Sequence, residues 1–347
     1  MDLYDPGRVE TCSSSITDSH CERSRIDSAP LDLPRICPAI LTLASQSLMR
    51  YPATATNAFS RIAQLTYALI SMMLLSACTS IAPPPPNPEI EPIRFLLSFD
   101  DGPSASAGDN PTEQILDTLA DNPVQPGIKA LFFVQTRAAA AGGSVKGQAL
   151  LQRQQREGHL LGFHTATPGH ANHRFLSPET LDQSLSDGVA DLAAISGSAP
   201  RLVRPPFWNY DERTFAAYQT HGLHLLLTDL SANDGKTWGI NGSLRRRSNL
   251  RDQLALTAQQ ISVGALPAVD GVIPVVVTFH DLNPYTARHI QEYLQILMDV
   301  AKDVGLATDK QPFYSNREAL QRAALRRALG DPLQYARLPG IWNWLWN

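Results

Sequence analysis

Apolar runs alternate with amphipathic stretches along most of the chain after residue 92. The runs IRFLLSF (93–99) and VIPVVVTFHD (272–281) have the continuous apolar character of strands that are buried on both faces. Stretches with helical spacing, such as 178–195 and 287–304, lie between or after such runs. Strands that alternate with helices predict parallel βα units and therefore an α/β fold.

Four shorter apolar runs extend this pattern, and most of them end in polar or ionisable residues. They are KALFFVQT (129–136), HLLGFHT (159–165), RLVRPPF (201–207) and HLLLTDL (224–230). In a parallel barrel the carboxyl ends of the strands gather on one face, where active sites are built. Asn110 followed by Pro111 predicts the start of a helix. Ser315 and Glu318 predict a capping box for an added C-terminal helix that stops at Gly330.

The segment before the globular pattern is organised as a signal peptide. Arg61 precedes an apolar stretch over 65–75, and small residues lead to Cys78. The stretch is about eleven residues long, too short to cross a hydrocarbon core of roughly 30 Å. LSAC (75–78) resembles a bacterial lipobox, which implies cleavage before Cys78 and acylation of that cysteine.

These features divide the chain into five expected segments. They are a disordered leader or over-extended gene start (1–48), a lipoprotein signal peptide (49–77), a Pro-rich tether (78–91), a globular domain (92–310) and a C-terminal helical extension (311–347). We expect a membrane-anchored lipoprotein whose domain faces the periplasm or the cell exterior. A buried apolar helix with an incidental cysteine is the alternative for 61–80.

Composition narrows the candidate chemistry. The formal net charge is -4 over 347 residues, and the sequence has no long basic blocks. It therefore does not predict the positively charged surface that binds nucleic acid. The one basic cluster, Arg245 to Arg247, is typical of solvent-exposed residues that lead into a helix. All four cysteines precede residue 79, so the globular domain has no disulfide framework and no cysteine-based metal site.

Candidate ligands for a metal ion follow two of the predicted strands. Asp100 and Asp101 end the first strand, and His164 ends the third, with His170 and His173 shortly after it. One carboxylate with two imidazoles is a common open ligand set for Zn²⁺ or a similar divalent ion. The other carboxylate is then free to act as a base. The residues alone leave open which histidine is the second ligand.

Five motifs stand in the order found in polysaccharide deacetylases, the family with a NodB-homology domain (carbohydrate esterase family four). They are SFDDGP, GHLLGFHT, VRPPF, the region of Asp234 and VVVTFHD, and the resemblance covers roughly residues 92–305. It implies a distorted (β/α) barrel of the polysaccharide deacetylase type, a divalent metal and a catalytic domain over 92–310 that hydrolyses N-acetyl groups of a sugar polymer.

The resemblance also implies roles for individual residues. Asp101 and His164 match metal ligands, and HANHRFLS (170–177) has the register that makes His170, rather than His173, the second histidine ligand. The family usually has two fewer residues between these histidines. The metal is expected to be Zn²⁺, with Co²⁺, Ni²⁺ or Mn²⁺ as alternatives.

The catalytic residues implied by the resemblance come from four motifs. Asp100 matches the base, Arg204 the arginine that orients it, His280 the general acid and Asp234 the aspartate that orients the histidine. Phe207 takes a place where the family often has Tyr.

Two tryptophans are candidates for substrate contact along with Phe207. Trp208 is either a sugar-stacking face or part of the core, and Trp238 either replaces a family Trp that is absent next to Asp234 or marks an altered groove wall.

The expected function is a metal-dependent hydrolase, a polysaccharide N-deacetylase. Its partner is an acetylated polysaccharide with N-acetylglucosamine-type units in the cell envelope or outside the cell. One alternative is an O-acetyl esterase acting on a glycan, which needs the same nucleophile but less acid assistance. The other is a catalytically weak, lipid-anchored glycan-binding protein on the same barrel.

Overall fold

The computed structural model describes residues 90–331, except for 235, 238–239, 242 and 244. The expected leader, signal peptide and most of the tether, including Cys78, lie outside the described residues, as do Trp238 and residues 332–347. None of the helices in the described part of the chain has the length and apolarity needed to cross a bilayer.

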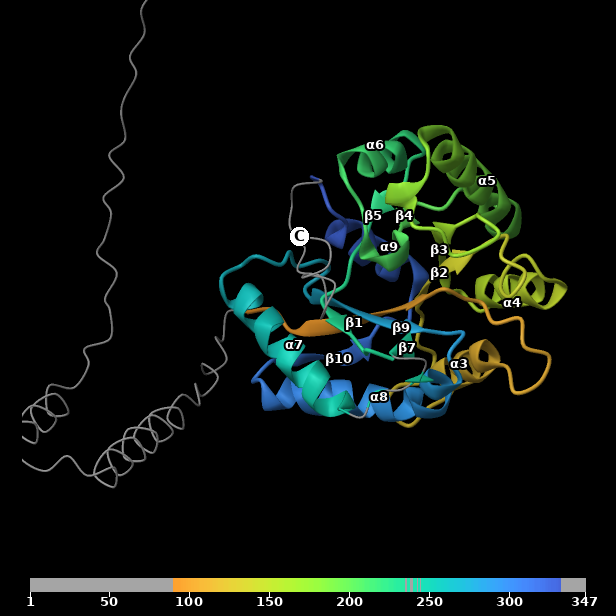
Figure 1. The fold of residues 1–347 in the computed structure, drawn as a ribbon. Coiled ribbons are helices and arrows are strands. Elements are labelled where there is room, and N and C mark those ends of the chain that lie inside the picture. The colour runs from red at the N-terminus through yellow and green to blue at the C-terminus, as the bar shows by residue number, and fades with distance from the viewer. Residues whose placement is uncertain (1–89, 235, 238–239, 242, 244, 332–347) are drawn as a thin grey trace, which may run out of the picture. The chain divides into compact units, whose positions relative to one another are not determined.

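One eight-stranded parallel sheet forms the centre of the described domain (Figure 1). Its strands are β1 (Ile93–Asp100), β2 (Leu131–Gln135), β3 (Leu160–Thr165), β4 (Leu202–Val203), β5 (His224–Leu225), β6 (Leu230–Ser231), β9 (Ile273–His280) and β10 (Thr308–Phe313). The order is β5-β4-β3-β2-β1-β9-β6, and β10 pairs with the start of β1. The strands at the two ends of this order, β5 and β6, are not paired with each other in the described part of the chain. The sheet is therefore a curled, incompletely closed barrel, which confirms the predicted fold class.

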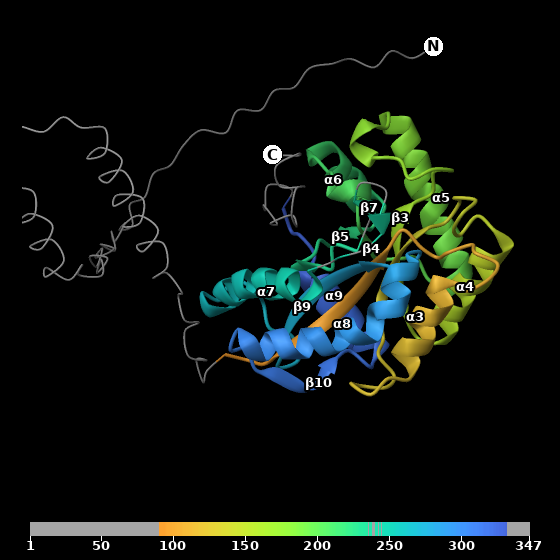
Figure 2. The same ribbon diagram turned by 60° about the horizontal axis from the view of Figure 1, so that its bottom comes forward.

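Helices cover the outer face of this sheet in two groups (Figures 1 and 2). The group near β1 and β9 comprises α3 (Pro111–Ala120), α7 (Arg246–Ser262) and α8 (Pro284–Asp303). The group around β2 to β5 comprises α4 (Val145–Arg156), α5 (Pro178–Ser196) and α6 (Glu212–Thr220). Two short 3₁₀ turns, η1 (His173–Phe175) and η2 (Pro206–Trp208), and an antiparallel pair, β7 (Lys236–Thr237) with β8 (Ile240–Asn241), complete the loops.

Alternation along β1 shows how the sequence builds two cores. Phe95, Leu97 and Phe99 belong to the larger cluster that packs against the outer helices. Leu96 belongs to a smaller cluster that includes Phe133 and side chains of α9 (Arg317–Arg327). Because side chains alternate between the faces of a strand, Ser98 and Asp100 lie on the same face as Leu96. That face is where the candidate site is built.

The added C-terminal helix is present, but its predicted boundaries are wrong. The N-cap of α9 is Asn316, whose side chain accepts a hydrogen bond from the backbone N–H of Ala319 at 2.9 Å. Ser315 instead donates to the side chain of Gln311, so it does not form a capping box with Glu318. Asn is as favourable as Ser at the N-cap position, and Asn316 occupies that position in place of Ser315. The helix ends at Arg327, before Gly330.

Two predicted strands are shorter than their apolar runs. The run 201–207 forms only β4, because Pro205 and Pro206 have no N–H to donate to a sheet ladder. The run 224–230 breaks after β5, where the carbonyl groups of Leu226 and Leu227 accept hydrogen bonds from a buried arginine. By contrast, Asn110 caps α3 and Pro111 begins it, as predicted.

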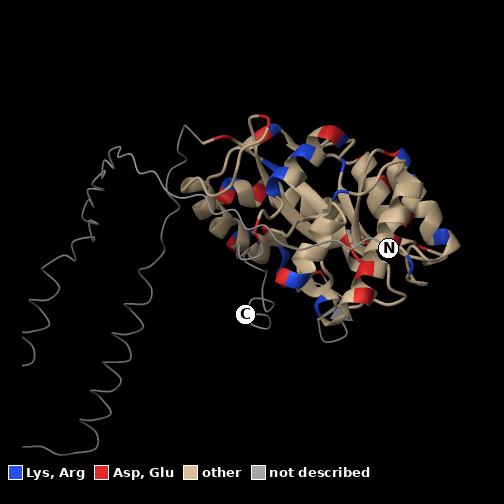
Figure 3. Ribbon diagram, turned by 90° about the horizontal axis from the view of Figure 1, so that it is seen from above, with Lys and Arg blue, Asp and Glu red and all other residues tan. Residues whose placement is uncertain are grey.

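Charged side chains of both signs are interspersed over the outer helices (Figure 3). Arg246 pairs with Glu292 at 2.8 Å, and Arg247 pairs with Asp299 and Asp303 at 2.8 and 2.7 Å. Arg246 and Arg247 of the basic cluster therefore form ion pairs between α7 and α8.

The predicted boundary between residues 310 and 311 falls inside β10, which pairs with β1.

Candidate active site

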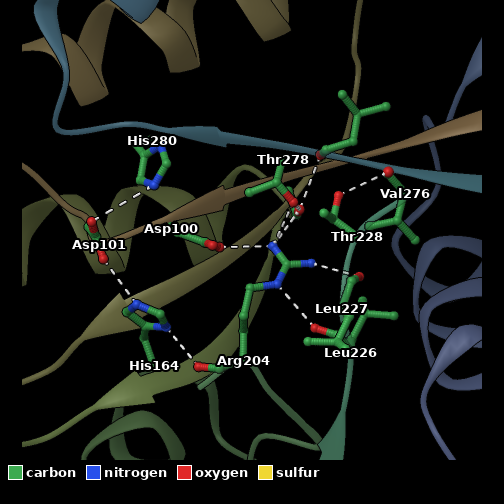
Figure 4. Close-up of polar contacts among 12 residues, drawn as sticks. Asp100, Asp101, His164, Arg204, Leu226, Leu227, Thr228, Val276, Thr278 and His280 are labelled. Atoms are coloured by element: carbon green, nitrogen blue, oxygen red, sulfur yellow. Dashed lines mark hydrogen bonds and ion pairs between the residues drawn. The ribbon is translucent and has the colours of Figure 1, made fainter. Parts of the chain in front are cut away.

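The carboxyl ends of β1, β3 and β9 bring the predicted site residues to one edge of the sheet (Figure 4). Asp100 is the last residue of β1 and pairs in register with His280, the last residue of β9. His164 lies in β3, and Arg204 directly follows β4. Parallel strands whose ends are polar thus place a base, an acid and potential ligands side by side, although they lie far apart in the sequence.

Three donor atoms converge at the centre of this site. His164 Nε2 lies 2.9 Å from His170 Nε2 and 2.9 Å from Asp101 Oδ1, and His170 Nε2 lies 3.1 Å from the same oxygen. The Nδ1 of His164 lies 2.7 Å from the carbonyl oxygen of Arg204. A ring nitrogen that faces a carbonyl must donate, so a neutral His164 ring, the form that binds a metal, would present its Nε2 lone pair to the centre of the cluster.

This donor set fits a divalent cation. Ligands held about 2.1 Å from one ion at angles of about 90–110° are separated by about 3.0–3.4 Å, close to the distances observed here. Burial raises the pKa of Asp101, but hydrogen bonds from His164 and His170 outweigh it and hold that pKa well below its usual range. Asp101 is therefore a carboxylate, the form that binds a metal.

His173 is placed away from this cluster. It is buried, its Nδ1 lies 2.9 Å from the hydroxyl of Tyr218, and its ring stacks on Phe163. Burial lowers the pKa of His173 to about 3, and the neighbouring His164 and His170 act in the same direction. The structure therefore brings His170, and not His173, to Asp101 and His164.

Asp100 is held by a fully buried arginine. Arg204 Nη1 donates to Asp100 Oδ1 at 2.8 Å and also to the hydroxyl groups of Ser98 and Thr278. Nε and Nη2 donate to the carbonyl groups of Leu226 and Leu227. Burial lowers the pKa of Arg204, and Asp100 opposes that shift. The planar guanidinium thus fixes one oxygen of Asp100.

His280 is held by a second buried carboxylate. Its Nδ1 lies 2.8 Å from Asp234 Oδ1, and its backbone N–H donates to Asp234 Oδ2 at 2.9 Å. Asp234 is fully buried and also accepts a hydrogen bond from the hydroxyl of Thr286. Burial lowers the pKa of His280, but Asp234 dominates and raises it to about 10. Its Nε2 points toward the cluster, 4.0 Å from Asp101 Oδ2.

The aromatic candidates divide between the site and the core. The Phe207 ring lies 4.6 Å from that of His170, and Phe207 has a left-handed backbone with φ of 61°. Trp208 is only 7% exposed and belongs to the core, where the guanidinium carbon of Arg204 lies 4.9 Å from its ring. Of the two interpretations of Trp208, the structure shows core packing.

Three polar residues of the site are absent from the sequence predictions. Ser98 and Thr278 each stand two positions before a predicted catalytic residue, on the same face of a buried strand. That period-two spacing of polar residues in apolar strands could have identified them. Gln135 ends β2 and donates to the backbone of Asp101. Its position at a strand end is the same signal that identified the other site residues.

Part of this chain is similar in sequence to one known family and to named deacetylases. Residues 89–226 match the family described as polysaccharide deacetylase. A chitin deacetylase of Pestalotiopsis sp is 28% identical over 143 residues, which cover 41% of this chain and 44% of the relative. A peptidoglycan-N-acetylglucosamine deacetylase of Bacillus cereus is 34% identical over 116 residues, or 32% of this chain and 35% of the relative. The matches thus span less than half the length of these curated relatives.

The chitin deacetylase of Colletotrichum lindemuthianum aligns with 65% of this chain and 90% of its own, at 22% identity and a TM-score of 0.44.

Proposed function

We propose that this protein is a metal-dependent N-deacetylase that removes acetyl groups from N-acetylglucosamine-type units of a cell-envelope or extracellular polysaccharide. The observation that carries the proposal is the placement of two oriented pairs, each held by a fully buried partner, around one ligand cluster. Asp100 with Arg204 and His280 with Asp234 flank Asp101, His164 and His170. The similar proteins include a deacetylase of chitin and a deacetylase of peptidoglycan N-acetylglucosamine, which supports this substrate class.

Asp101, His164 and His170 are the residues that would hold the ion. A divalent cation bound there would polarise the acetamide carbonyl and lower the pKa of a water molecule. His164 is oriented for this role by the carbonyl oxygen of Arg204, which accepts from its Nδ1. Such partners of ligating histidines fix the ring orientation. Zn²⁺ is the proposed ion, since its usual ligands include imidazole and carboxylate.

Asp100 acts as the general base in this proposal. Arg204 donates to one carboxylate oxygen at 2.8 Å, which leaves the other oxygen to accept a proton from the attacking water. Because the guanidinium is planar and fully buried, it holds the Asp100 carboxylate in one orientation.

His280 acts as the general acid. An amide nitrogen leaves poorly as an anion, so it must be protonated as the C–N bond breaks. Asp234 accepts from Nδ1 of His280 and stabilises the imidazolium, and Nε2 of His280 faces the site. Glycan binding alone needs neither a base nor an acid, and the two oriented pairs therefore favour an enzyme over a glycan-binding protein.

The experiment that tests the proposal is an acetate-release assay on the purified full-length protein. The panel is N-acetylglucosamine oligomers, peptidoglycan, acetylated exopolysaccharide and O-acetylated xylan, each with chelator and with added Zn²⁺. We expect Zn²⁺-dependent release from the N-acetylated substrates. Release from acetylated xylan alone would favour the O-acetyl esterase, and full activity in metal-free protein would refute metal dependence.

We also propose that the protein is anchored to a membrane by a lipid on Cys78. The support is the apolar stretch before LSAC and the Pro-rich segment after it. The anchored domain would face the periplasm or the cell exterior, where the proposed polysaccharide substrates occur.

A further inference from the structure

The ligand Asp101 has an unusual backbone conformation. Its φ is 71°, in the left-handed region that residues other than glycine rarely adopt. Asp100, directly before it, continues β1 and pairs with Arg204, whereas Asp101 turns away from the strand toward His164 and His170. The position of the Asp101 carboxylate therefore depends on a turn that the surrounding structure has to hold.

Gln135, at the end of β2, contacts this turn twice. Its backbone N–H donates to the carbonyl oxygen of Gly102 at 3.0 Å, and its side-chain Nε2 donates to the carbonyl oxygen of Asp101 at 2.8 Å. Two consecutive peptide groups of the turn are thus fixed by one residue. Gln135 is only 7% exposed, so water competes little for these bonds.

Gln135 is itself fixed by its neighbours. The register between β2 and β3 shifts between Val134 and Gln135, so that Gln135 pairs with Thr165. Such irregularities re-aim side chains next to active sites. The carbonyl oxygen of Gln135 accepts from the backbone N–H of Gly142 at 3.0 Å, and a Cβ at Gly142 would lie only 2.5 Å from that oxygen.

The opposite side of the turn is closed by packing. A Cβ at Gly102 would lie 1.9 Å from Oδ1 of Asp281, so only glycine fits there. Asp281 is held in place by Thr112, whose hydroxyl lies 2.9 Å from Asp281 Oδ2. Packing limits the space of the turn, while the hydrogen bonds from Gln135 select its conformation.

We propose that Gln135 is a positioning residue for the metal site. By donating to the Asp101 carbonyl, its side chain holds Asp101 in the left-handed conformation that places the carboxylate against His164 and His170. This inference rests on the proposed function for the presence of a metal at that site. If the turn is released, a smaller fraction of the protein is competent to bind, and the apparent affinity falls by that fraction.

The test compares Gln135→Met with a matched control, Gln125→Met, in the purified full-length protein. Methionine keeps the length of the side chain, and the backbone bond of residue 135 to Gly102 remains. Gln125 is also buried and makes two hydrogen bonds, one to the carbonyl oxygen and one from the N–H of Phe313, at 2.9 and 3.0 Å. It lies before β2 begins, so its loss removes a buried amide without touching the turn.

Two measurements distinguish a positioning role of Gln135 at the metal site from a general loss of stability. The first is the Zn²⁺ dissociation constant from competition with a chromophoric chelator, and the second is the visible absorption spectrum of the Co²⁺ form. For Gln135→Met we expect Zn²⁺ binding to weaken about tenfold or more, the usual scale for partners of metal ligands, with an altered Co²⁺ spectrum. For Gln125→Met we expect wild-type affinity and an unchanged spectrum.

Wild-type affinity in Gln135→Met would overturn the inference, as would an equal loss in Gln125→Met. Should Gln135→Met not fold, Gln135→Asn serves in its place, because its amide is one methylene too short to reach Asp101. We expect the same loss of affinity, and wild-type affinity in Gln135→Asn would overturn the inference. Wild-type protein that binds Zn²⁺ yet releases no acetate would refute the proposed activity alone, whereas wild-type protein that binds no divalent ion would refute this inference as well.

Discussion

Arg204 Nη1 lies 2.8 Å from Asp100 Oδ1, and both side chains are almost completely removed from solvent. A buried ion pair of this kind is costly to break, because the remaining charge has no water to solvate it. The same pair therefore contributes both to the stability of the barrel and to the orientation of the proposed base.

Replacing Asp100 should separate catalysis from metal binding. Asp100→Asn keeps the shape of the side chain but cannot accept a proton, so we expect acetate release to fall by roughly two to four orders of magnitude. Metal content by elemental analysis should stay at the wild-type level, because the three proposed ligands are untouched. Asp101→Asn is the comparison and should lose both metal and activity. A fully active Asp100→Asn protein would contradict the assignment of the base.

Removing Arg204 should lower stability strongly. Arg204→Met leaves the Asp100 carboxylate buried and unpaired, and we expect the free energy of unfolding to fall by about 3–5 kcal/mol. Arg94→Met is the control, because Arg94 pairs with Asp309 in a partly exposed position, where such a pair contributes about 1 kcal/mol or less. Urea denaturation measures both values, and equal losses would show that burial of the Arg204 pair has no special effect.

The two histidines that follow β3 should behave differently when replaced by alanine. His170→Ala removes a proposed ligand from a partly exposed position and should lower the metal content without unfolding the protein. His173→Ala removes a buried ring and its contact with the Tyr218 hydroxyl, so it should lower the free energy of unfolding by about 2 kcal/mol or more. Its metal content should remain near that of the wild type. If only His173→Ala lost its metal, His173 would be the ligand and His170 would not.

Buried histidines should make the domain sensitive to acid. The Nδ1 of His159 accepts a hydrogen bond from the N–H of Ala130 at 3.1 Å, and burial lowers the pKa of His159 to about 3. The unfolded chain has a histidine pKa of about 6.5, so the native state favours the neutral ring. This contribution to stability is complete above about pH 6.5 and is lost as the pH falls toward 3, by up to about 1.4 kcal/mol per pH unit.

Urea denaturation between pH 7 and pH 4 measures this effect. The free energy of unfolding should fall less steeply with decreasing pH in His159→Gln than in the wild type. His224→Gln, at an exposed position, is the control and should keep the wild-type slope. Parallel curves for all three proteins would show that His159 does not contribute.

The lipid anchor predicts a defined mature N-terminus. When the gene is expressed from Met49 in a bacterial host, the protein should begin at an acylated Cys78, as the lipobox resemblance implies. Intact-mass and peptide mass spectrometry of the membrane fraction detect the modification, and Cys78→Ser should move the protein to the soluble fraction. An unmodified chain that retains residues 49–77 would refute the anchor.

Local patterns in the sequence determined the elements of the fold. The apolar runs 93–99 and 272–281 form β1 and β9, which pair along their whole length, because continuous apolar sequence is stable only when both faces are covered. Asn110 and Pro111 set the start of α3 through contacts within four residues. The polar residues at the ends of β1, β3 and β9 predicted the edge of the sheet that carries the site, since parallel strands align their carboxyl ends.

Tertiary structure decided what lies within reach of each of these residues. Arg204 is joined to Ser98 and Thr278, which come from two other strands, and no spacing along the chain reveals such contacts. The loop after β3 places His170 beside Asp101 and turns His173 into the core, a choice that depends on the fold around Tyr218. Sequence spacing specifies which face of a strand a side chain occupies, whereas distances between side chains of different strands depend on how the whole sheet curls and packs.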